Sequence, residues 1–206
     1  MTVTISRLYD NYNDAQRAVN ELEAAGVPHS DISIIANNSD NWYGQDGKVD
    51  RDRDGVDDRA EGAGAGAGVG AGLGGAAGLL AGLGLLAIPG LGPVVAAGWL
   101  AATAVGAAAG AAAGGIVGAL TQAGISEDDA DAYAEGVRRG GTLVTARVAD
   151  ADQARFDDIL DRSAVDLKSR RADWQKSGWG SYNPAADPYS AEQVRQERSR
   201  YTSRSV

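Results

Sequence analysis

The chain has 206 residues, a formal net charge of −9, no cysteine and a single histidine, His29. The lack of cysteine excludes disulfide bonds and thiol catalysis, and the acidic balance argues against nucleic acid, whose phosphates attract basic surfaces. No catalytic arrangement of Ser, His and Asp is recognisable, so the sequence predicts a protein that is not an enzyme. The first residues lack the pattern of a secretory signal peptide, which predicts that the globular part is cytoplasmic.

Charged side chains are distributed unevenly. Between Glu61 and Glu127 the sequence contains no Asp, Glu, Lys, Arg or His, whereas ordinary soluble sequence lies on both sides. This pattern predicts one folded domain that is interrupted by an uncharged insert. The expected regions are the first half of the domain (1–39), an acidic loop (40–61), a Gly/Ala-rich insert (62–124), a helix with the second half of the domain (125–170), and a polar tail with aromatic residues (171–206).

The first region has the periodicity of a β-α-β unit. The stretch TVTISRLY (2–9) alternates as a strand does. NDAQRAVNELEAAG (13–26) repeats apolar residues at helical spacing and ends at Gly26, a residue type common just after a helix. DISIIA (31–36) is typical of a short buried strand. We therefore expect a strand, a helix and a strand in this order.

The acidic loop contains DRDRDGVDDRAE (50–61), which fits the calcium-loop pattern D-x-D-x-D-G-x5-E. Alternating carboxylates converge on a hard cation, and the glycine permits the sharp turn. Arg51 and Arg53 lie between the aspartates, so a solvated run of charges is the alternative. If calcium binds, we expect a structural ion that orders the junction with the insert. The predicted ligands are Asp50, Asp52, Asp54, the Val56 carbonyl, Asp58 through a water molecule, and Glu61.

Small residues recur every four positions in the insert, and glycine dominates the series, a spacing that lets two helices approach closely. Ile88–Pro93 interrupts the run near its middle, so we expect two antiparallel helices that meet there. Three environments remain open for this glycine-zipper hairpin: a membrane, the core of a soluble oligomer, or, if it does not fold, a flexible linker. The glycines predicted to mediate self-association are Gly66, Gly70, Gly74, Gly78, Gly82, Gly98, Gly106, Gly110, Gly114 and Gly118.

The region after the insert predicts a helix and a second β-α-β unit. SEDDADAYAEGVRRGG (126–141) begins with a serine N-cap and an acidic first turn and ends in basic residues, as suits the helix dipole. We expect a strand at 142–149, a helix at 150–164 and a short strand, VDLKSR, at 165–170. Together the two units predict an α+β fold, a ferredoxin-like split βαβ sandwich interrupted by the long helical hairpin. This fold serves many functions and therefore indicates none.

The tail carries Trp174, Trp179, Tyr182 and Tyr189 among glycine, proline and basic residues. We expect mostly irregular structure with a short final helix. A segment of this kind can contact a membrane surface or a partner. Packing against the protein's own domain accounts for the same aromatic residues equally well.

The sequence ISRLYDNYNDAQRAVNELEAAGVPHSDISIIANN (5–38) resembles the opening of the general stress protein 17M-like (YflT-type) domain family. The apolar insert, followed by YAEGVRRGGTLVTARV (133–148), is similar to glycine-rich members in which a hydrophobic insert interrupts the domain. The resemblance covers roughly residues 1–170. It implies a bacterial, stress-associated, non-enzymatic protein and transfers no catalytic residue.

Two functional hypotheses follow. In the first, the hairpin lies in the bacterial inner membrane, the globular domain is cytoplasmic, and the glycine rows bring copies together. In the second, the protein is cytoplasmic and the hairpin forms the core of a homo-oligomeric shell or bundle, which calcium could stabilise. The chain is its own partner in both hypotheses, membrane lipid is a further partner in the first, and no nucleic acid is expected in either.

Overall fold

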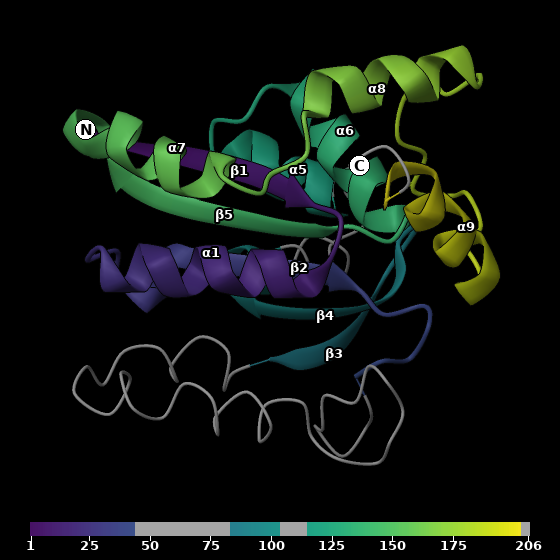
Figure 1. Ribbon diagram of the computed structural model, residues 1–206, viewed down its shortest axis with the longest axis horizontal. Helices are drawn as coiled ribbons and strands as arrows, with labels where there is room; N and C mark the ends of the chain where they lie inside the picture. Colours follow the sequence, from purple (N-terminus) through teal and green to yellow (C-terminus); the bar gives the residue numbers. More distant parts are fainter. Residues whose placement is uncertain (44–82, 104–114, 203–206) are drawn as a thin grey trace.

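The computed structural model of the protein describes residues 1–43, 83–103 and 115–202. Five strands form a sheet with helices on both of its faces (Figure 1). In chain order the elements are β1 (Thr2–Tyr9), α1 (Tyr12–Ala24), the short 3-10 helix η1 (His29–Asp31), β2 (Ile32–Asn37), β3 (Gly84–Ile88), β4 (Gly92–Gly98), α5 (Gly115–Gln122), α6 (Glu127–Arg138), β5 (Thr142–Ala149), η2 (Asp150–Asp152), α7 (Gln153–Asp161), α8 (Leu167–Lys176) and α9 (Ala191–Thr202).

The strands pair antiparallel throughout, in the order β1-β5-β2-β4-β3. Because β5 is antiparallel to both β1 and β2, these two strands run parallel to each other, with α1 as their connection. This part of the sheet is a split β-α-β arrangement. The predicted mixture of α and β structure is confirmed.

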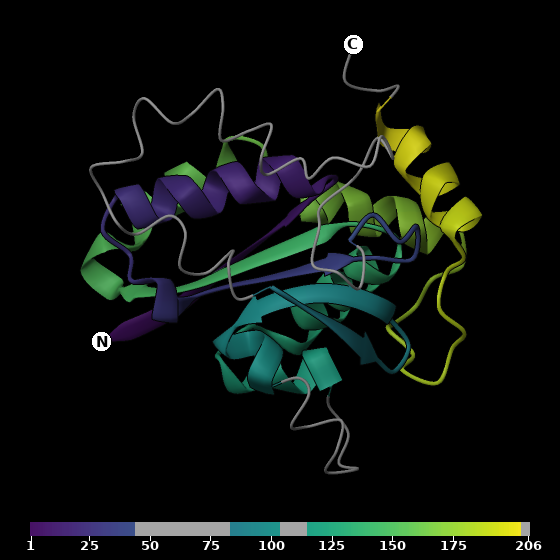
Figure 2. The same ribbon diagram turned by 90° about the horizontal axis from the view of Figure 1, so that it is seen from below.

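Helices lie on both faces of the sheet (Figure 2), and each face has its own core. The core under α1 and α7 includes Ile5, Tyr9, Val19, Leu22 and Leu160. The core under α5, α6 and α8 includes Leu8, Ile35, Ile116, Leu120 and Trp174. Successive strand residues point to opposite faces, so β1 and β2 contribute to both cores. All six residues of β2 are buried, because helices cover both faces of the sheet at this strand.

Two helix ends follow the expected capping chemistry. The Ser126 hydroxyl accepts a hydrogen bond from the Asp129 backbone N–H and starts α6, as predicted. Gly26 follows α1 with a φ of 101°, a conformation that glycine adopts without strain. The backbone N–H of Val27 donates to the Leu22 carbonyl across this end of the helix.

The described part of the insert differs from the prediction. Ile88–Pro93 does contain a turn, but the turn joins β3 and β4, with Ile88 opposite Gly92, and the predicted helices are wrong for residues 84–98. Isoleucine and valine favour strands, whereas each glycine in a helix costs about 1 kcal/mol relative to alanine. Gly90 and Gly92 have positive φ values of 76° and 82°, which the tight turn requires.

The predicted last strand is also wrong, because its residues from Leu167 onward begin helix α8. The Asp166 side chain accepts a hydrogen bond from the Ser169 N–H and caps this helix. Of the pairing with β1 that a strand here would make, the structure shows one backbone hydrogen bond, from Val165 N–H to the Leu8 carbonyl, at 2.7 Å. The sheet is extended at its opposite edge by β4 and β3, so the complete ferredoxin-like sandwich is not confirmed.

Candidate functional site

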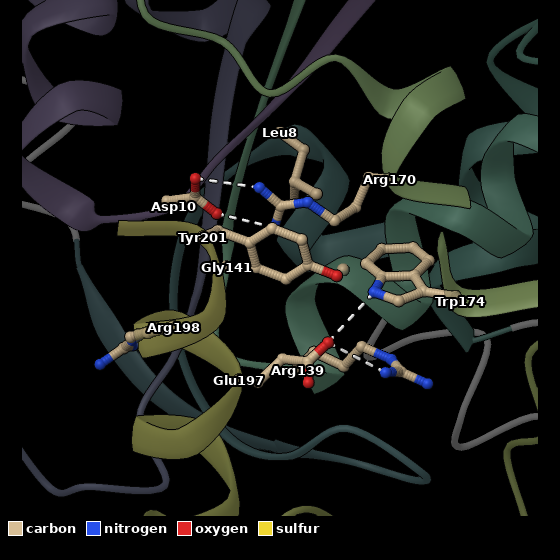
Figure 3. A pocket seen from close by; sticks show the side chains of 10 residues that line it. Leu8, Asp10, Arg139, Gly141, Arg170, Trp174, Glu197, Arg198 and Tyr201 are labelled. Atoms are coloured by element: carbon tan, nitrogen blue, oxygen red, sulfur yellow. Dashed lines mark hydrogen bonds and ion pairs between the residues drawn. The ribbon is translucent and has the colours of Figure 1, made fainter. Parts of the chain in front are cut away.

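A small cavity lies where α9 packs against α6, α8 and the end of β1 (Figure 3). Its free volume of about 10 Å³ is roughly the room that one water molecule needs. Gly136 lets α6 approach β1 closely, because a Cβ atom there would lie 2.4 Å from Leu8 Cδ2. The charged and aromatic side chains around the cavity are Asp10, Arg139, Arg170, Trp174, Glu197, Arg198 and Tyr201.

Glu135 is a buried carboxylate with a relative exposure of 1%. The sequence places Arg138 and Arg139 three and four residues later, on the same face of α6. Arg138 Nη1 lies 3.1 Å and Arg139 Nε 2.5 Å from Glu135 Oε1. Burial works against the Arg139 charge, but the contacts with Glu135 and Glu197 outweigh it and raise the pKa of Arg139 above its ordinary value. The two carboxylates therefore favour the charged form of Arg139.

Glu197 brings α9 into the same network. Its Oε1 accepts hydrogen bonds from Arg139 Nη1 at 3.0 Å and from Trp174 Nε1 at 3.2 Å. Arg200 Nη1 donates to the other carboxylate oxygen at 2.9 Å. Helices α6, α8 and α9 therefore meet at one buried carboxylate, which Figure 3 shows beside the Trp174 ring.

A second ion pair holds the end of β1 to α8. Arg170 donates to both carboxylate oxygens of Asp10, at 2.8 and 3.0 Å. The Tyr201 ring of α9 stacks on the guanidinium, whose carbon lies 3.4 Å from the ring centre (Figure 3). Arg198 of α9 donates to the Gly140 carbonyl and to Asp40. These contacts join α8 and α9 to each other and to the loops that follow β1, β2 and α6.

Residues 179–190, between α8 and α9, form a segment that we call the strap. It reaches the β3–β4 turn, as Figure 2 shows. The Tyr182 hydroxyl donates a hydrogen bond of 2.7 Å to the Pro89 carbonyl. The Tyr189 ring lies 4.5 Å from the Arg138 guanidinium, and Arg138 also donates to the Asp187 carbonyl. The strap therefore connects the insert to the charged network of α6.

Tyr182 predicts weakening of the structure at alkaline pH. Burial raises the pKa of Tyr182 to about 12, so the unfolded chain releases this proton at lower pH than the folded chain does. Stability should therefore fall as the pH rises from about 10 to about 12. We expect Tyr182→Phe to show about 1–2 kcal/mol less of this loss in the free energy of unfolding, measured at pH 9 and 11. An identical loss in both proteins would contradict this role, since other buried tyrosines are common to both.

The chemistry of the site is that of attachment. Its carboxylates are occupied by guanidinium and indole donors, and the cavity of about 10 Å³ has room for about one water molecule. Within residues 1–43, 83–103 and 115–202, no three histidine or acidic side chains are grouped as a metal site would require. The arrangement neutralises buried charge and fixes α9, the strap and the hairpin relative to one another.

Most residues predicted as sites cannot be compared with this geometry. The proposed calcium ligands from Asp50 to Glu61 lie outside the described residues, as do the glycines from Gly66 to Gly82 and from Gly106 to Gly114. Calcium binding and the glycine rows there stay predictions. Gly98 is at the end of β4 with a φ of 90°, and a Cβ atom there would lie 2.3 Å from the Ile32 carbonyl oxygen. Gly118 lies half-buried in α5.

The sequence indicates only part of the charged network around Glu135 and Glu197. The spacing of Glu135, Arg138 and Arg139 indicates ion pairs on one helix face. That spacing does not predict a contact with Glu197. Glu197 lies 58 positions from Arg139 in the sequence, and only the tertiary fold brings the two side chains together. The aromatic residues of the tail pack against the protein's own domain in this structure, with Trp174 only 2% exposed.

Comparison with known proteins assigns part of the chain to a family. Residues 4–84 match the model of the heat induced stress protein YflT domain. The match begins in β1 and ends at the first residue of β3, so it covers β1, α1 and β2. No curated protein and no solved structure matches the chain. The resemblance to the YflT-type family is confirmed over this segment, which is less than half of the chain.

Proposed function

We propose that the protein is a non-enzymatic, stress-associated protein that self-assembles through its uncharged insert. The observation that carries this proposal is the position of β3, which is the outermost strand at one edge of the sheet. A strand in this position offers unpaired backbone groups to another chain. The family match supports the link to stress, and the geometry of the edge supports the assembly.

The backbone groups available at this edge follow from the pairing of β4. The Pro93 carbonyl accepts a hydrogen bond from Asn38 N–H, so it points toward β2. Pairs alternate along an antiparallel ladder, and the pair of Ala87 with Pro93 is therefore not hydrogen-bonded. The N–H and C=O groups of Ala87, and those of Leu85 two residues earlier, consequently point outward.

The two edges of the sheet are built differently. At β1, the chain between α7 and α8 lies alongside, and Val165 N–H occupies the Leu8 carbonyl. Arg7 of β1 forms ion pairs with Asp157 and Asp161 of α7. In contrast, β3 has the sequence GLLAI, with no charge and no proline, and Leu85 is 38% exposed. Among the described strands, β3 has the edge best suited to pairing.

A second copy of the same strand is the partner that fits best. Antiparallel pairing of two β3 strands places the same surface on both subunits, as a two-fold symmetric dimer requires. It would bring uncharged residues together and satisfy the outward N–H and C=O groups of both chains. The pairing would join two five-stranded sheets into one continuous sheet.

The membrane hypothesis is less well supported than the soluble assembly. It required residues 84–98 as helices, and these residues are strands of the sheet. The helices of the described segments are each too short or too polar to cross a bilayer. We therefore place self-association in the homo-oligomeric form of the proposal.

Replacing Ala87 with proline should weaken self-association. Proline removes an outward N–H group but leaves the β3–β4 hydrogen bonds intact. Loss of this hydrogen bond in both copies should weaken association by about tenfold or more. The measurement is native mass and light scattering over a range of protein concentrations.

Ala87→Ser is the matched control, because it changes the same side chain and keeps the N–H group. Circular dichroism should show both variants folded. A wild-type protein that remains monomeric at every concentration would contradict the proposal. Equal association of the proline and serine variants would also contradict it.

A further inference from the structure

We propose that the strap and α9 form a releasable latch that holds the β3–β4 hairpin on the sheet. When the latch is docked, the turn of the hairpin is fixed; when the latch detaches, the turn opens and β3 loses its fixed edge. The effect on the hairpin stands on contacts within one chain. The consequence for self-assembly rests on the function proposed above.

The strap contacts the hairpin at its tip. A Cβ atom at Gly90 would lie 2.6 Å from the Tyr182 hydroxyl and 2.7 Å from Pro184 Cα. A Cβ atom at Gly92 would lie 2.7 Å from Pro188 Cβ. The glycines of the turn therefore serve the approach of the strap as well as the backbone conformation. Because the strap covers the tip, opening of the turn requires it to move.

The contact matters at the tip of the hairpin, because β3 joins the sheet through β4, which itself pairs with β2. β3 has five residues, and its described ladder is with β4 alone. At the tip, Leu91 N–H donates to the Ile88 carbonyl at 3.0 Å, and the Pro89 carbonyl accepts from Tyr182. Short edge elements with few tertiary contacts are the first to open in native proteins.

Several features make the strap itself easy to detach. Within residues 180–190 its internal backbone hydrogen bonding consists of one contact, from Ala186 N–H to the Asn183 carbonyl. Trp179 Nε1 and Arg138 Nε are buried where the strap packs, and neither has an acceptor. Both donors would gain water on release, so docking of the strap has an opposing cost. A segment of this composition is suited to docking and release rather than to permanent burial.

The anchor of the latch is α9. Val194 is fully buried, and a Cβ atom at Gly140 would lie 2.5 Å from Val194 Cγ1. Glu197 supplies the polar contacts, with Arg139, Trp174 and Arg200 as donors. The charge of Glu197 therefore supplies part of the attachment of α9, and Arg198 adds hydrogen bonds to the Gly140 carbonyl and to Asp40.

The test compares two neutralising substitutions on the same helix. Glu197→Gln removes the buried charge, whereas Glu192→Gln removes an exposed charge in the first turn of α9. Hydrogen exchange of the full-length protein is followed at the Leu91 amide and along β4. We expect exchange at the hairpin to accelerate by about tenfold or more in Glu197→Gln, with β1 and β5 unchanged. Glu192→Gln should match the wild type.

Tyr182→Phe provides a second variant that removes one hydroxyl and no charge. It should accelerate exchange at Leu91 by a smaller factor while leaving α9 protected. Equal hairpin exchange in the wild type, Glu197→Gln and Tyr182→Phe would overturn the latch. If exchange accelerates but the native mass does not change, the latch stands and its link to self-assembly is overturned.

Discussion

Replacing Trp174 with alanine is expected to lower the free energy of unfolding by about 3–5 kcal/mol. The side chain is 2% exposed and is among the largest fully buried groups of the protein. It packs edge-on against Trp179, with ring centres 5.7 Å apart, and the Arg139 guanidinium lies 5.0 Å from its ring. Its Nε1 donates to Glu197. The substitution therefore leaves both a cavity and a buried carboxylate with one donor fewer.

Urea-induced unfolding followed by circular dichroism measures this change. Trp174→Phe is the informative companion, because it retains an aromatic ring but removes the Nε1 donor. Its expected loss is about 1–3 kcal/mol. A loss below about 1 kcal/mol in the alanine variant would show that α8 and α9 contribute little to the stability of the domain.

Arg139→Met is expected to destabilise the protein by about 3–5 kcal/mol. Methionine preserves much of the packing but removes the guanidinium between two buried carboxylates. Glu135 would retain Arg138, and Glu197 would retain Arg200. Neither of these contacts replaces the bridge that joins α6 to α9. The cost arises because desolvated negative charges lose their shared partner.

The control is Arg162→Met, which breaks an exposed ion pair with Glu21. The side chain of Arg162 is 64% exposed, and such a pair contributes between about 0 and 1 kcal/mol. Thermal and urea unfolding of both variants give the comparison. Similar losses at positions 139 and 162 would mean that the buried network behaves as a surface charge cluster does.

The local sequence pattern was sufficient to predict those elements whose local preference agrees with their tertiary packing. Clear periodicity predicts the strands β1, β2 and β5. The helices α1 and α6 also have recognisable ends, with Gly26 after α1 and Ser126 as the N-cap of α6. In α7, Leu160 is buried and Ile159 partly buried, whereas Ala154, which the same helical spacing would place inward, is exposed. In each of these elements, local preference and tertiary packing favour the same structure.

In the insert, the regular glycine spacing predicts helices, whereas the local sequence of residues 84–98 favours strands. The four-residue glycine spacing stops at Gly82 and resumes at Gly98, and the segment between them contains Leu, Ile and Val, which favour strands. These residues pair with β2 through β4 and bury Ile88, Val94 and Val95. A tertiary pairing of this kind cannot be read from spacing within one segment.

The strand predicted at 165–170 failed for a different reason. VDLKSR alternates apolar and polar residues over too few positions to separate a strand from the start of a helix. Asp166 is the N-cap of α8, so the segment continues as a helix. This helix places Trp174 in the core. The charged network could not be predicted either, because the contact between Glu197 and Arg139 depends on the packing of α9 against α6.

The position of β5 has a consequence for how the chain is made. β1 and β2 are complete once residue 37 has been synthesised, yet neither pairs with the other; both obtain their shared partner from residues 142–149. A ribosome adding about 5–20 residues per second delivers that partner only after several seconds. During this interval β2 can pair with β4, which is complete at residue 98, but the side of β2 that meets β5 stays open. The strand that joins the two halves of the sheet is therefore synthesised after both of its neighbours.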